Sequence, residues 1–147
     1  MKRISRSTLV WTILVLALSF VGASTAAAQE RLSDKDLEQR MENLNNDSKK
    51  FQSNFNNSIS KSSIRKTSQE KDAKKLADNF TKSTKILYEH FKKTKKSDPY
   101  LQNTLNYADQ LEKIQSSVQL DSATSASWTK VRTQLNDIAH AFHLSVN

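Results

Sequence analysis

From Gln29 to Asn147 the sequence contains no glycine and no cysteine, and its one proline is Pro99. The only glycine of the whole chain is Gly22. Tight β-turns depend heavily on glycine, so its absence favours helices joined by polar turns. The composition also excludes Gly-rich phosphate loops, the nucleophile elbow, disulfides and thiol nucleophiles. We therefore expect this region to be all-α.

The N-terminal segment has the layout of a secretory signal peptide. Three basic residues within the first six precede an uncharged apolar run at 9–21 and a group of small residues at 23–28. The run has 13 residues, fewer than the roughly 20 that a membrane-spanning helix needs. We expect a signal peptide over 1–28, cleavage near Ala28, and a periplasmic or secreted mature chain without a transmembrane segment. An uncleaved signal anchor is the alternative.

Positive charge is concentrated in one part of the expected mature chain. Its 119 residues contain 20 Lys and Arg and 15 Asp and Glu. Between Lys61 and Lys96 there are 12 basic and 4 acidic residues, whereas the segments before and after this stretch carry net charges of −1 and −2. One segment therefore provides the whole positive excess, and it is expected to attract anions.

The first amphipathic pattern repeats at alternating steps of four and three residues, which places its members on one face of a helix. The six positions are Leu37, Met41, Leu44, Ser48, Phe51 and Phe55. Ser33 followed by Asp36 predicts a capping box at the start of this helix. Asparagine and serine become frequent near its end and lower helix propensity. We expect a helix over about 33–60 and a turn within 57–66.

Three further helices are predicted in the same way. Thr67 with Glu70 forms a second capping box, and Asp98-Pro99 is expected to provide the N-cap and first-turn proline of the third helix. The expected ranges are about 67–96, 99–119 and 123–144. The apolar stripes are Ala73, Leu76, Phe80, Leu87 and Phe91; Leu101, Leu105, Ala108, Leu111, Ile114 and Val118; and Trp128, Val131, Leu135, Ile138 and Phe142. Short connections favour an up-and-down antiparallel four-helix bundle over 29–147.

Residues suited to catalysis or metal binding are sparse. The histidines are His90, His140 and His143, and the pair of Glu-x-x-His motifs of di-iron bundles is absent. His140 and His143 lie one turn apart, but a zinc site needs three or four convergent ligands. We expect His140 to be exposed, no metal site, and no enzyme activity.

Two short segments at the ends of the mature chain resemble the small periplasmic b-type cytochromes. Residues 36–45 (DLEQRMENLN) are similar to the opening of that family, and Gln134-Leu135 with Ala141-Phe142-His143 is similar to its closing helix. The resemblance implies Met41 and His143 as axial ligands of haem b and one-electron transfer as the function. Plain core packing is the alternative role of Met41.

A wider resemblance covers most of the mature chain. Its motifs are RLSDKD at 31–36, Phe51 with SSIR at 62–65, and Trp128, Leu135, Ile138-Ala139 and Ala141-Phe142 near the end. The chain is similar in these motifs to an uncharacterised family of short exported helical proteins of environmental Gram-negative bacteria. This resemblance implies export and a helical fold, and it implies no catalytic residue.

The basic second helix is the other candidate site, because its lysines surround the apolar stripe. These lysines are Lys71, Lys74, Lys75, Lys82, Lys85, Lys92, Lys93, Lys95 and Lys96. Base-stacking aromatics and arginines are missing among them, so nucleic acid is not the expected partner. We expect an exported, non-catalytic protein that binds an envelope protein or an anionic envelope surface. A solvated face that aids solubility, or a haem carrier, is the alternative.

Overall fold

The computed structural model describes residues 32–144, and the expected signal peptide at 1–28 lies outside this range. The described part is all-α. Its helices are α1 (Asp34–Ile59), α2 (Ser68–Thr94), α3 (Tyr100–Ser117) and α4 (Ser122–Ala141). Each end lies within three residues of the expected one, and the predicted turn after the first helix occupies residues 60–67.

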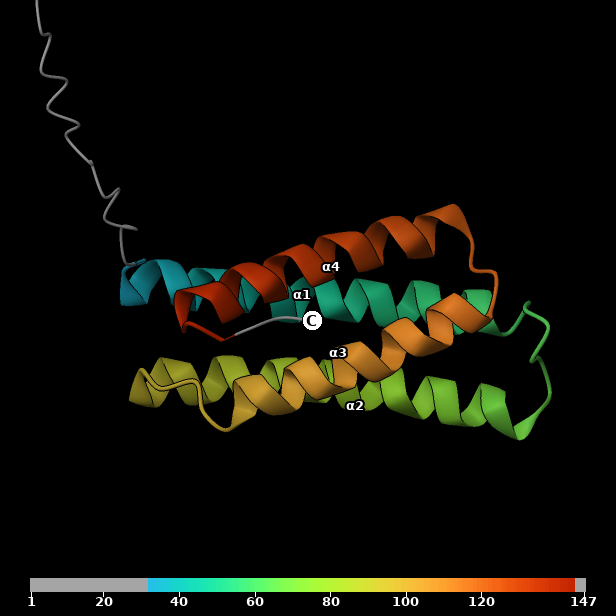
Figure 1. The fold of residues 1–147 in the computed structure, drawn as a ribbon, viewed down its shortest axis with the longest axis horizontal. Helices are drawn as coiled ribbons and strands as arrows, with labels where there is room; N and C mark the ends of the chain where they lie inside the picture. The colour runs from blue at the N-terminus through green and yellow to red at the C-terminus, as the bar shows by residue number, and fades with distance from the viewer. Residues whose placement is uncertain (1–31, 145–147) are drawn as a thin grey trace, which may run out of the picture. The chain divides into compact units, whose positions relative to one another are not determined.

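The helices form a bundle in which neighbours run antiparallel (Figure 1). The first helix, α1, packs against both α2 and α4, and α2 also packs against α3. In the view of Figure 1, α3 runs obliquely, and within the described residues it makes few contacts with α4. The start of α1 and the end of α4 lie at the same end of the bundle.

The buried residues confirm most of the predicted stripes. All six predicted positions of α1 are buried, including Ser48. In α2, however, Ala77 is fully buried, whereas Leu76 is half-buried and packs against the core at its margin. The buried positions 73, 77, 80, 84, 87 and 91 follow one another at steps of four and three in strict alternation, and Leu76 lies to one side of that line. Ile114 and Phe142 are likewise half-buried at the margins of their helices.

Phe51 lies at the centre of an aromatic cluster that joins three helices. Its ring centroid is 4.9 Å from that of Trp128 on α4 and 6.5 Å from that of Phe80 on α2. Phe55, one turn along α1, is 5.3 Å away, and Phe80 and Trp128 are 5.8 Å apart. Such tilted and edge-on pairs add to the free energy of burying the rings. The cluster therefore holds α1, α2 and α4 together.

Ser48 is a polar member of the core, and α2 provides its partner. The Oγ of Ser48 lies 2.8 Å from the Oγ1 of Thr84, and Ser48 also donates to the carbonyl oxygen of Asn45. The hydroxyl of Thr81 donates to the Ser48 carbonyl oxygen at 3.3 Å. A buried hydroxyl without a partner would destabilise the fold, so these bonds explain how the stripe tolerates serine.

Two predicted helix starts are confirmed and one is wrong. The hydroxyls of Ser33 and Thr67 accept from the backbone N–H groups three residues later, at 3.1 and 3.3 Å. At α3 it is Pro99, and not Asp98, that occupies the N-cap position, without a side-chain cap. The reason is local, because the N–H of Leu101 finds the carbonyl oxygen of Ser97 at 3.0 Å and needs no carboxylate.

Candidate functional site

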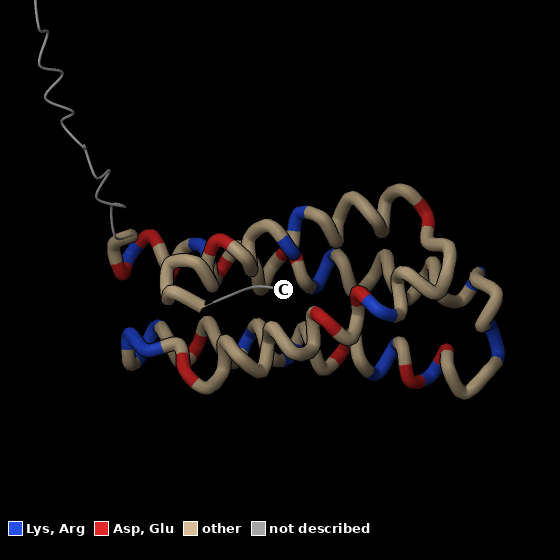
Figure 2. The backbone as a smooth tube through the Cα atoms, viewed as in Figure 1, with Lys and Arg blue, Asp and Glu red and all other residues tan. Residues whose placement is uncertain are grey.

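Basic residues recur along α2 (Figure 2), and most of its lysines are exposed. Steps of three, four and seven residues relate most of those from Lys71 to Lys93, which places them opposite the buried positions of α2. Lys96 lies two residues beyond the end of the helix. Eight of the nine predicted lysines are exposed, and Lys74 is half-buried. We use the term lysine face for seven of the exposed residues. They are Lys71, Lys75, Lys82, Lys85, Lys92, Lys93 and Lys96.

Most of the lysine face has no acidic partner. Lys71, Lys75, Lys93 and Lys96 make no ion pair with any residue between 32 and 144. The ammonium of Lys92 lies 5.7 Å from the centroid of the Tyr88 ring. Two ion pairs do lie on the face, Lys82–Asp78 at 2.6 Å and Lys85–Glu89 at 3.7 Å. Both are exposed, and exposed pairs of this kind contribute little to stability. The face therefore presents a net positive charge to solvent.

Lys74 and Lys95, the other two predicted binding lysines, connect parts of the fold. The ammonium of Lys74 lies 2.6 Å from Glu70 Oε1 and 2.7 Å from Ser60 Oγ, which ties α2 to the end of α1. The ammonium of Lys95 lies 2.6 Å from Glu38 Oε2 on α1. The hydrogen bond from Lys95 lowers the pKa of Glu38. Both lysines are engaged within the bundle, and this could not be read from their spacing along the sequence.

Glu70 is the acid most affected by such contacts. Hydrogen bonds from Lys74 and from the backbone N–H of Lys66 lower its pKa from 4.5 to about 2. A depressed pKa in the folded state means that the carboxylate stabilises the fold above pH 4.5. This contribution is lost as the pH falls toward 2.

We therefore expect the melting temperature of Glu70→Gln to fall less between neutral and acid pH than that of the unmodified protein. The measurement is thermal unfolding by circular dichroism between about pH 6 and pH 2. The neighbouring variant Gln69→Ala keeps the carboxylate and should keep the acid dependence of the unmodified protein. A Glu70→Gln profile with the unmodified slope would show that this carboxylate is not coupled to folding.

Two cations, Arg40 on α1 and Lys130 on α4, are paired with acids across the boundary between these helices. Asp47, which is buried on α1, accepts from Lys130 at 2.8 Å and from Gln134 at 2.9 Å, both on α4. Burial raises the pKa of Asp47, but these hydrogen bonds outweigh burial and lower it. Arg40 pairs with Asp137 at 3.2 Å. Cations of this kind connect helices and leave little charge available to a partner.

Between α3 and α4, one arginine makes a bridge. Arg132 on α4 lies 3.0 Å from Asp109 and 3.4 Å from Glu112, both on α3. Its side chain is 12% exposed. Sequence reasoning missed this bridge and the Asp47 contacts, because ion pairs between distant segments leave no periodic signal.

Met41 and His143 lie in different environments. Met41 is completely buried on α1. His143 is exposed, lies two residues beyond the end of α4, and has a left-handed backbone with φ of 58°. His140 is exposed, as predicted. The structure thus places the thioether in the core and the imidazole at the surface.

Comparisons with protein-family models, curated proteins and solved structures find no match. Among residues 32–144 no three His, Cys, Asp or Glu side chains are grouped so that they could hold a metal ion. None of the four helices described is both long and apolar enough to cross a membrane.

Proposed function

We propose that this chain is an exported, non-catalytic interaction protein that binds negatively charged partners in the cell envelope through the lysine face. In this proposal a signal peptide at 1–28 is removed near Ala28. The remaining chain works as an up-and-down antiparallel four-helix bundle in the periplasm or outside the cell. The acidic partner is an anionic lipid surface or an acidic envelope protein, and nucleic acid is not a partner.

One contrast carries the proposal. Lys71, Lys75, Lys93 and Lys96 are exposed and have no ion pair with a described residue, whereas Arg40 on α1 and both Lys130 and Arg132 on α4 brace neighbouring helices. Unneutralised charge on one side of a rigid helix creates a positive potential that attracts anions and speeds their association. Because the lysines lie opposite the buried stripe, a partner can contact them without disturbing the core.

The test is a charge reversal of the four unpaired lysines, in the variant K71E/K75E/K93E/K96E. Two probes represent the two kinds of partner, vesicles of phosphatidylcholine with phosphatidylglycerol, and poly-L-glutamate. Each lysine near an anionic surface contributes about 1 kcal/mol, so the variant should bind at least about 100-fold more weakly. Binding of the unmodified protein should fall steeply between about 50 and 500 mM NaCl.

A matched control variant distinguishes the effect of the lysine face from the effect of the protein's net charge. The variant K35E/K49E/K61E/K113E reverses four exposed lysines on other parts of the bundle and has the same net charge. It should retain most of the affinity, and circular dichroism should show both variants to be folded. An equal loss in the control, or no salt-dependent binding of either probe, would refute the proposal.

A further inference from the structure

A row of hollows lies between α2 and α3. Three hollows of about 320 Å³ each follow one another along these helices, the first beside Tyr100 and the third beside Ile64. The first and second share Asn79 and Tyr107, and the second and third share Asp72 and Ile114. The hollows are therefore adjacent, and we call them together the α2–α3 groove. It extends from Tyr100 at one end of the helix pair to Ile64 at the other.

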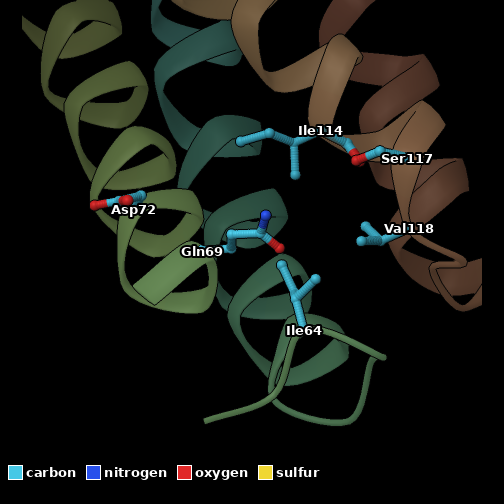
Figure 3. Close-up of a pocket in the computed structure, with 6 residues that line it drawn as sticks. All are labelled: Ile64, Gln69, Asp72, Ile114, Ser117 and Val118. Carbon is cyan, nitrogen blue, oxygen red and sulfur yellow. The ribbon is translucent and has the colours of Figure 1, made fainter. Parts of the chain in front are cut away.

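The lining of the groove is mixed, and solvent reaches several of its apolar side chains. Ile86 is 46% exposed and is the only large apolar side chain classed as exposed within residues 32–144. Leu76, Tyr107 and Ile114, which also line the groove, are half-buried. At the far end, Ile64, Ile114 and Val118 point toward one another around Gln69 (Figure 3). Apolar and tyrosine side chains gathered in one depression are typical of a protein-binding surface.

The two walls of the groove differ in charge. Lys75 and Lys82 belong to the α2 wall, which continues outward into the lysine face. The α3 wall is uncharged, with amides and tyrosines such as Asn103, Gln110 and Tyr107. Asp72 is the only acid of the lining. A complementary partner therefore has an apolar stripe and acidic residues along the margin that faces α2.

The shape of the groove favours one kind of partner with this chemistry, an α-helix. A depression between two antiparallel helices accepts the side-chain ridge of a third helix, with anchors at i, i+3 or i+4, and i+7. A second copy of this chain using the same groove would bring two lysine faces close together, and like charges disfavour that arrangement. A flat bilayer fits a concave groove less well than a helix does.

We propose that the α2–α3 groove binds an acidic amphipathic helix of another protein. Ile86, Leu76, Tyr107 and Ile114 contact its apolar stripe, and Lys75 and Lys82 contact its acidic margin. The acidic preference rests on the proposed function of the lysine face. The contact with the apolar stripe is an additional claim about a separate set of side chains.

The experiment uses two fluorescent designed peptides of about 18 residues. Both carry the same leucine stripe on a helix, with glutamate along its margins in one peptide and lysine in the other. We expect the glutamate peptide to bind the mature protein at least about tenfold more tightly than the lysine peptide. Ile86→Glu should weaken binding of the glutamate peptide by about tenfold or more. The double variant K75E/K82E should reverse the preference between the two peptides.

The control variant K35E/K49E changes two exposed lysines of α1 that belong neither to the lining nor to the lysine face, and it should alter affinity by less than about threefold. Ile86 is exposed, so Ile86→Glu is expected to remain folded, as circular dichroism will show. Unchanged peptide binding by Ile86→Glu would overturn the groove proposal. It would also be overturned if the unmodified protein bound neither peptide while Ile86→Glu lost vesicle binding, because Ile86 would then contact lipid. An unreversed preference in K75E/K82E would overturn the acidic margin. A different result would refute the proposed function of the lysine face, namely normal binding of vesicles and poly-L-glutamate by the four-lysine variant.

Discussion

Replacement of Phe51 by alanine is expected to lower the free energy of unfolding by about 3–5 kcal/mol. The ring is fully buried and meets Phe55, Phe80 and Trp128 within 6.5 Å, centroid to centroid. Its removal leaves a cavity where three helices meet, and the helix backbones cannot close it without losing other contacts. The loss would be a large part of the stability of a domain of this size.

Urea denaturation followed by far-UV circular dichroism measures this effect. Ile86→Ala is the matched control, because it also removes apolar atoms from a helix but at an exposed position. Its effect should stay within about 0.5 kcal/mol. A Phe51→Ala variant that loses less than about 1 kcal/mol would show that the aromatic cluster is not the centre of the core.

Met41→Ala is expected to destabilise the protein by about 2–5 kcal/mol, as does loss of other fully buried large side chains. His143→Asn should change stability by less than about 0.5 kcal/mol. The imidazole is exposed, and asparagine tolerates the left-handed backbone at this position. The two positions thus differ strongly in their expected effect on folding.

Urea denaturation of the two variants tests this difference, and a haemin titration tests the haem alternative. If Met41 and His143 were axial ligands, the unmodified protein would give a sharp low-spin spectrum, and each substitution would abolish it. If Met41 serves packing, only Met41→Ala loses stability and neither variant changes a broad, non-specific haemin adduct. Equal stability of Met41→Ala and the unmodified protein would contradict the packing role.

The helices were predictable because each carries its own local signal. The stripe from Leu37 to Phe55 and the caps at Ser33 and Thr67 depend on residues three and four positions apart, and helix geometry brings such neighbours together without help from the rest of the chain. Local signals can also compete with one another. At α3 the carbonyl oxygen of Ser97 takes the place that the sequence suggested for Asp98.

The candidate site was predictable only in part. Spacing along α2 identified the basic residues, but it did not separate Lys74 and Lys95, which are bound within the fold, from unpaired lysines such as Lys71. It also did not reveal the α2–α3 groove. Leu76 and Ile114 appear in the sequence as core residues, and only the oblique packing of α3 leaves them partly open.

The sequence by itself determined which segments of the described chain are helical and which faces they bury. Apolar residues at helical spacing lie on one face of a helix, so burying that face removes all of them from water. Only the tertiary structure decided which charges are neutralised and where apolar surface remains accessible. Lys95 and Glu38 are 57 positions apart, and their atoms meet at 2.6 Å solely because α1 and α2 pack side by side. Ion pairs and grooves depend on distances in space, which helical periodicity does not encode.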